Sequence, residues 1–206
     1  MDDPRINGER LWASLMEMAR IGATPAGGVC RLTLSDFDKE ARDLFIAWCE
    51  YAGCSISVDR IGNIFARRAG DDDSLPPVMT GSHLDTQPTG GKFDGAYGVL
   101  AGLEVMRTLN DYGVETNAPF EAIAWTNEEG CRFATSMAGS GAFAGVYTID
   151  YLCALKDVDG LAFGEELERI GYAGAEAVGG RPVAAYFEAH IEQGPFLEAE
   201  NKTIGV

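Results

Sequence analysis

The chain has 206 residues, of which 46% are hydrophobic and 23% charged, and its formal net charge is −16. This length and composition are typical of one soluble globular domain, and no apolar run reaches the roughly 18 residues of a membrane span. The acidity disfavours nucleic acids and anionic membranes as partners, because both require a basic surface.

The first part of the chain is predicted to form two helices and a hairpin. Residues 5–21 carry apolar side chains at spacings of three and four, which is typical of an amphipathic helix. Ser35 opens a second helix through the capping-box-like "SDFD", and Gly53 ends it. Residues 54–70 alternate apolar and polar side chains around "DRIGN", which predicts a β-hairpin.

The remainder alternates strands and helices. Residues 78–85 form an apolar strand that runs into a glycine-rich turn, and 96–113 form a helix that packs on a sheet. Two further strands are predicted in 120–130 and 182–200, with short helices between them. This order favours an α/β fold with a mixed, mostly parallel sheet flanked by helices. No repeat or linker divides the chain, so 1–206 is interpreted as one domain.

Two features of the sequence, its first 20 residues and its cysteines, indicate the cellular compartment. Residues 1–20 are acidic where a signal peptide would be basic, and they contain no long apolar stretch. The five cysteines form no CxxC motif and are odd in number, which fits reduced thiols. We therefore expect a cytoplasmic protein.

Polar residues gather where three apolar strands end. Because ligands bind beyond the carboxyl ends of strands in open α/β sheets, we predict that these residues and Asp94 meet at one edge. A lone histidine is usually a satisfied polar residue, but both histidines of this chain stand beside carboxylates, which favours a divalent metal site. The three groups are His83 with Asp85, Glu128 with Glu129, and His190 with Glu192.

The turn "GSHLDTQPTGGKFDGAYG" supports the same interpretation. Gly95 and Gly98 flank the start of the following helix, where the backbone must approach the site closely. The stretch contains neither GxGxxG nor GxxxxGK[ST], which disfavours a nucleotide site.

Three motifs, "GSHLDTQPTGGKFDGAYGVLAGLEV", "TNEEGCRF" and "EAHIEQGP", resemble the metal-dependent hydantoinase/carbamoylase family of amidases. That family includes N-carbamoyl-L-amino-acid hydrolases, β-ureidopropionases and allantoate amidohydrolases, within a wider clan of di-metal exopeptidases and deacylases. The resemblance implies hydrolysis of a linear amide or ureido C–N bond, with an N-carbamoyl-L-amino acid as the first choice of substrate. The alternatives are an allantoate amidohydrolase, a deacylase or dipeptidase of the clan, and an inert fragment that only binds metal.

The resemblance also implies a set of metal ligands. His83 and His190 are similar in position to the ligands of a first metal, Asp94 to a carboxylate that bridges two metals, and Glu129 to a ligand of the second. The implied cofactors are two divalent ions, zinc or else manganese, cobalt or nickel.

The remaining implied roles concern catalysis. Glu128 corresponds to the general base, and Asp85 to a residue that orients His83 from behind. Gln193 lies close enough in sequence to line the substrate pocket. The wider clan also leads us to expect an unusual backbone, such as a cis peptide, at Asp94–Gly95.

The family chain continues past Val206, with a smaller domain that forms the lid and the dimer contact, and with a C-terminal histidine that completes the second metal site. We therefore expect residues 1–206 to be the N-terminal part of a catalytic di-metal hydrolase domain, and the parent protein to be a homodimer. We also expect this chain to bind one metal tightly and a second one weakly or not at all. Its hydrolysis of substrate should then be very slow, because the attacking water loses one of its two Lewis acids and the lid contacts are missing.

Overall fold

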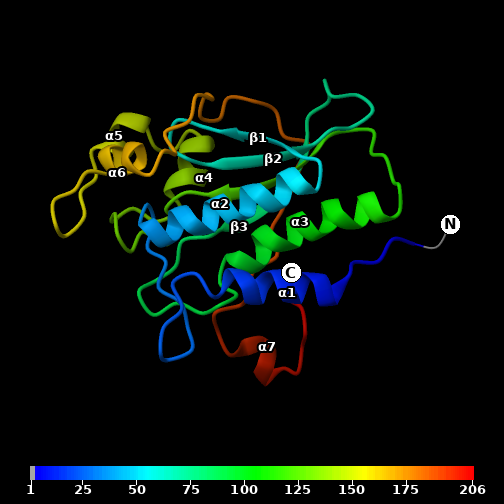
Figure 1. The fold of residues 1–206 in the computed structure, drawn as a ribbon, viewed down its shortest axis with the longest axis horizontal. Coiled ribbons are helices and arrows are strands. Elements are labelled where there is room, and N and C mark those ends of the chain that lie inside the picture. The colour runs from blue at the N-terminus through cyan, green and yellow to red at the C-terminus, as the bar shows by residue number, and fades with distance from the viewer. Residues whose placement is uncertain (1–2) are drawn as a thin grey trace.

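A computed structural model describes residues 3–206 and shows a sheet with helices packed around it (Figure 1). The sheet has five strands in the order β1-β2-β4-β3-β5. β2 (Ile64–Arg68) pairs antiparallel with both β1 (Ser55–Val58) and β4 (Phe120–Trp125), whereas β3 (Val78–His83) runs parallel to both β4 and β5 (Ala185–Phe187). The mixed α/β sheet and the hairpin of β1 and β2 are therefore confirmed.

The described residues form three long helices and four short ones. α2 and α3 pack against the strands, and α1 lies against α3. None of the helices in the described part of the chain has the length and apolar character to cross a bilayer. The helices are α1 (Gly8–Met18), α2 (Asp36–Tyr51), α3 (Ala96–Asp111), α4 (Ala138–Phe143), α5 (Ile149–Cys153), α6 (Phe163–Arg169) and α7 (Phe196–Ala199).

Helix α2 begins as its sequence predicts. The Ser35 side chain accepts a hydrogen bond from the backbone N–H of Asp38, which satisfies one of the free donors of the first turn. The helix ends at Tyr51, and Gly53 follows with a φ of 84°, a conformation that favours glycine. Helix α1 is shorter than predicted, because only Gly8–Met18 of residues 5–21 is helical.

Alternation along β4 separates the two faces of the sheet. Ala122 and Ala124 belong to the main core, into which α3 packs, and the small side chain at Ala122 lets Gly102 of α3 approach closely. Trp125 belongs to a second apolar cluster on the opposite face, where its ring lies 5.3 Å from that of Phe143 in α4. Helices thus cover both faces, as predicted, and they leave the strand ends free.

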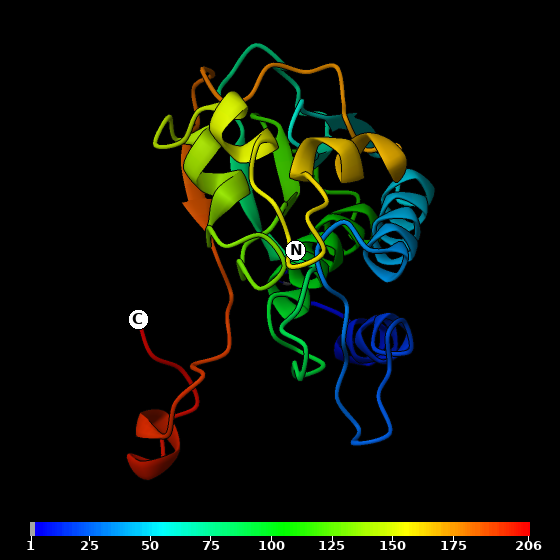
Figure 2. The same cartoon turned by 90° about the vertical axis from the view of Figure 1, so that its left-hand side faces the viewer.

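The last strand departs from the prediction. β5 has only three residues, and the side chains of Tyr186 and Phe187 are exposed, so it is not a buried strand. The reason is its position: β5 is an edge strand with a neighbour, β3, on one side only. The chain beyond β5 runs away from the body of the domain to α7, as Figure 2 shows.

Candidate metal site

His83, Asp94 and His190 come together beyond the ends of β3 and β5. His83 is the last residue of β3, and Asp94 lies in the turn just before α3. Asp94 Oδ1 lies 3.8 Å from His83 Nε2 and 3.3 Å from His190 Nε2. One ligand atom from each residue lies within 4.8 Å of the other two, so a single metal ion can contact all three.

Backbone carbonyls set the tautomer of both histidines. His83 Nδ1 lies 2.7 Å from the carbonyl oxygen of Asp85, and His190 Nδ1 lies 2.8 Å from that of Ile191. A carbonyl oxygen can only accept, so Nδ1 carries the proton in each neutral ring. Nε2 of each ring is then left with a free lone pair that faces Asp94, which is the form a metal requires.

Two carboxylate oxygens at this place are buried without a partner. Asp94 Oδ1 and Glu129 Oε1 accept no hydrogen bond from any described residue, although neither is reached by solvent. An unpartnered buried carboxylate oxygen is unfavourable, and a cation would satisfy it. Two imidazole nitrogens with carboxylate oxygens suit zinc, manganese, cobalt or nickel, so the residues present fit a divalent metal.

The electrostatics of the cluster also favour a cation. Burial on its own lowers the pKa of His83, but the nearby Asp85, Glu128 and Glu129 carboxylates raise it overall. Burial raises the pKa of Asp85 to about 6. Burial, together with repulsion from Asp94 and Glu128, raises the pKa of Glu129. Within residues 3–206 no lysine or arginine forms an ion pair with these four carboxylates, and only the two histidines lie within ion-pair distance of Asp94 and Glu128.

Asp85 contacts His83 through its main chain. Its backbone carbonyl, and not its carboxylate, binds the imidazole. The buried carboxylate instead accepts hydrogen bonds from the backbone N–H groups of Glu128, at 3.2 Å, and Glu129, at 3.3 Å. These two N–H groups follow the end of β4 and have no strand to pair with, so the Asp85 carboxylate holds the turn that presents both glutamates.

Residues 79–206 match Peptidase family M20/M25/M40. The chain belongs to this family. It is 59% identical over 205 residues to an N-carbamoyl-L-amino-acid amidohydrolase of Rhizobium meliloti, covering 100% of this chain and 49% of that protein. It is 35% identical over 199 residues to a ureidoglycolate hydrolase of Arabidopsis thaliana, covering 92% and 42%.

Solved structures give the same result for this M20/M25/M40 chain. It superimposes with a TM-score of 0.98 and 61% identity on a hydantoinase/carbamoylase family amidase from Burkholderia vietnamiensis, covering 100% of this chain and 50% of that one. The resemblance found in the motifs is therefore confirmed. The chain spans about half the length of the curated relatives it matches.

Two glutamines contact the carboxylates of the cluster, and the sequence predicts only one of them. Gln193 donates to Asp94 Oδ2 at 2.6 Å, which places it at the cluster as predicted, while its contact with substrate stays a prediction. Gln87, which was not predicted, donates to Glu129 Oε2 at 3.2 Å. The signal for Gln87 is its spacing, because His83, Asp85 and Gln87 are alternate residues of one extended segment.

Glu192 does not join the site. Its carboxylate accepts from the backbone N–H groups of Phe196, at 3.0 Å, and Leu197, at 2.9 Å. It therefore caps the start of α7, which follows it by four residues.

Gly95 allows the turn to pass against His83. Its φ is 64°, and a Cβ atom at this position would overlap the imidazole ring. The peptide bonds of the described residues are all trans, so the expected cis bond at Asp94–Gly95 is wrong. The unusual feature of this backbone is the positive φ of Gly95, which only glycine adopts at little cost.

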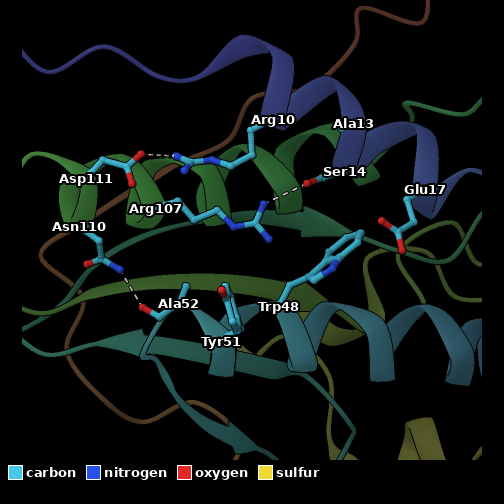
Figure 3. A pocket seen from close by; sticks show the side chains of 10 residues that line it. All are labelled: Arg10, Ala13, Ser14, Glu17, Trp48, Tyr51, Ala52, Arg107, Asn110 and Asp111. Carbon is cyan, nitrogen blue, oxygen red and sulfur yellow. Dashed lines mark hydrogen bonds and ion pairs between the residues drawn. The ribbon is translucent and has the colours of Figure 1, made fainter.

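A separate hollow of about 440 Å³ opens between α1, α2 and α3, and Figure 3 shows its side chains. Arg107 donates to Ser14 Oγ at 3.0 Å there, and Arg10 pairs with Asp111 at 2.8 Å. The hollow is lined by no histidine or cysteine, so the ligand cluster at the sheet edge remains the candidate site of this M20/M25/M40 chain.

Proposed function

We propose that this chain carries the catalytic residues for hydrolysis of the C–N bond in an N-carbamoyl-L-amino acid. The observation that carries the proposal is the cluster of His83, Asp94 and His190, with both Nε2 atoms directed at an unpartnered Asp94 oxygen. The substrate class is supported by two relatives, the N-carbamoyl-L-amino-acid amidohydrolases of Rhizobium meliloti and, at 40% identity, of Geobacillus stearothermophilus.

Each residue of the cluster has a distinct part in the proposed reaction. When bound, a divalent metal supplies a Lewis acid that polarises the ureido carbonyl and lowers the pKa of water. Glu128 is the general base: its carboxylate takes a proton from the attacking water and passes it to the leaving nitrogen. The Glu128 side chain is 30% exposed and its Oε2 lies 3.6 Å from His83 Nε2, so it stands beside the ligands and open to substrate.

Two residues behind the reacting groups hold them in place. Asp85 fixes the backbone of Glu128 and Glu129, and its carbonyl holds the ring of His83. Gln193 contacts Asp94 and would also line the substrate pocket.

We propose a second divalent ion held by Asp94 and Glu129. Support comes from Glu129 Oε1, which is buried without a partner, and from the carboxylate repulsion that raises the pKa of Glu129. Zinc, manganese, cobalt and nickel all suit this donor set.

The cellular setting and assembly follow from the family resemblance. The proposed partner is a small N-carbamoyl or ureido substrate, in the cytoplasm, with neither nucleic acid nor a membrane. The acidity and the five free cysteines agree with that setting. We propose that residues 1–206 form the N-terminal part of a catalytic domain whose parent protein is a homodimer through a smaller lid domain.

The test is turnover of a substrate panel by the full-length protein and by the 206-residue chain alone, each loaded in turn with zinc, manganese, cobalt and nickel. We expect the full-length protein to release the free amino acid from N-carbamoyl-L-amino acids and not from their D-enantiomers, and the 206-residue chain to do so very slowly. Faster hydrolysis of ureidoglycolate or allantoate would favour the second candidate, which the ureidoglycolate hydrolases of rice and Arabidopsis thaliana, both 35% identical, support. Tight metal binding without turnover of any of these compounds would indicate a fragment that only binds metal.

A further inference from the structure

Side-chain hydrogen bonds tie the segment before His190 to the neighbouring strands. Ser82 donates to Glu188 Oε1 at 2.6 Å, and the Tyr186 hydroxyl donates to Glu188 Oε2 at 2.9 Å. The indole N–H of Trp125 in turn donates to the Tyr186 oxygen at 2.9 Å. Ser82 is fully buried, so no water replaces Glu188 as the acceptor of its hydroxyl proton.

The backbone ladder between β3 and β5 does not reach the two histidines. The last residues paired between β3 and β5 are Thr80 and Phe187, and both His83 and His190 lie beyond that pair. The ladder therefore leaves the separation of the two imidazole rings, 5.8 Å between centroids, to other contacts.

Glu188 bridges this gap beyond the ladder. Its partner Ser82 immediately precedes His83, and Glu188 itself lies two residues before His190. The Glu188 carboxylate thus joins the segment that carries His83 to the segment that carries His190. Gly98 of α3 packs against both segments, because a Cβ atom there would lie 2.6 Å from the carbonyl oxygen of Ala189 and 2.8 Å from Cβ of Ser82.

We propose that Glu188 is a positioning residue that sets the distance between His83 and His190. The inference rests on the proposed function, because it takes these two histidines as ligands of one metal. Glu188 touches neither ring through any hydrogen bond of the described residues, so it acts through Ser82 and through its own backbone. Hydrogen-bonded groups behind metal ligands typically contribute about 10–100-fold to metal affinity.

The chain offers a matched control for Glu188. Glu192 is the same residue type, equally far from His190 along the chain, but its carboxylate caps α7 and contacts no sheet strand. Glu188→Ala should weaken zinc binding about 10–100-fold, whereas Glu192→Ala should leave it unchanged.

Glu188→Gln separates positioning from charge. Its carbonyl oxygen can accept from Ser82, and its amide can donate to Tyr186, whose hydroxyl proton then turns to the Gly81 carbonyl oxygen 3.1 Å away. Positioning therefore predicts that Glu188→Gln recovers most of the zinc affinity that Glu188→Ala loses. A direct effect of the negative charge predicts that both variants are equally weak.

The experiment is a zinc titration of the full 206-residue chain in competition with a chromogenic chelator, with circular dichroism to confirm folding. We expect the wild-type chain, Glu192→Ala and Glu188→Gln to bind alike and Glu188→Ala to bind more weakly. Wild-type affinity in a folded Glu188→Ala chain, or no recovery in Glu188→Gln, would overturn the inference while leaving the metal site in place. A wild-type chain that binds no zinc would overturn the proposed function as well.

Should Glu188→Ala fail to fold, Ser82→Ala tests the same hydrogen bond from its β3 side. It removes only the 2.6 Å hydrogen bond, and we expect several-fold weaker zinc binding. Unchanged zinc affinity in Ser82→Ala would contradict the proposed link.

Discussion

Replacing Gly95 by alanine should damage the metal site directly. An alanine at the φ of 64° and ψ of −49° of Gly95 adopts a sparsely populated backbone conformation, which costs about 1–3 kcal/mol. Its Cβ would also lie 2.5 Å from Cδ2 of His83, whereas carbon atoms in ordinary contact are about 3.5–4.0 Å apart. The ring must therefore retreat by about 1 Å, and crowding of this kind costs about 1–3 kcal/mol.

Together these effects predict that Gly95→Ala lowers the free energy of unfolding by about 2–6 kcal/mol. Because the displaced ring no longer holds its Nε2 atom at its present place beside Asp94, we expect zinc affinity to fall at least about tenfold, and a displacement of about 1 Å can lower turnover about 100-fold. Urea unfolding measures the first quantity, and a chelator competition titration measures the second.

Gly91→Ala is the matched control, because Gly91 lies in the same turn and a Cβ atom added there would meet no atom within 4 Å. It should change neither quantity by more than a few tenths of a kcal/mol. The reasoning fails if Gly95→Ala binds zinc as tightly as Gly91→Ala does, since the ring of His83 would then not depend on the glycine.

Three further predictions concern other parts of the chain. In the full-length parent protein, Glu128→Gln should keep zinc binding and lower kcat by about 10²–10⁴-fold, and a near-normal kcat would remove Glu128 from the role of base. Calorimetric titration with zinc should show one tight site, from His83, Asp94 and His190, and a weaker second site with only Asp94 and Glu129; two equally tight sites would contradict the ligand count. Burial raises the pKa of Asp59, in the hairpin turn, to about 6, against 3.8 ordinarily. Between about pH 3.8 and pH 6 the folded chain keeps a proton on Asp59 that the unfolded chain releases. The free energy of unfolding should therefore fall by about 3 kcal/mol as the pH rises through this range. Asp59→Asn should flatten this slope in urea unfolding, and an unchanged slope would show that another group causes it.

The sequence indicates the parts of the fold whose signals are local. The hairpin of β1 and β2 follows from alternation around a turn, and the start of α2 follows from Ser35 and its capping contact. The meeting of His83, Asp94 and His190 follows from a general rule, because polar residues beyond the ends of adjacent parallel strands share one edge of a sheet.

Features that depend on tertiary geometry are less accessible. The sequence of β5 is as apolar as that of β4, and only its place at the sheet edge leaves Phe187 exposed. The Asp85 carboxylate binds the backbone that follows β4 and not the ring of His83. This depends on where β4 ends relative to β3, which the sequence does not show. Glu192 and Glu188 are equally far from His190 along the chain. Glu192 nevertheless faces away from the strands, because the chain turns toward α7 there and no sequence pattern predicts that turn.

Because β5 is the last strand of the chain, its position also affects the order in which native contacts can form during folding. Ser82 and Glu188 are separated by 106 residues, and Asp94 and Gln193 by 99, whereas the hairpin of β1 and β2 closes over a short turn. Contacts of such long range carry the largest loop-closure entropy and form slowly. The two histidines therefore become neighbours only after the last strand has joined the sheet. A metal that binds them would therefore stabilise the completed domain by mass action, because the unfolded chain does not hold the two histidines together.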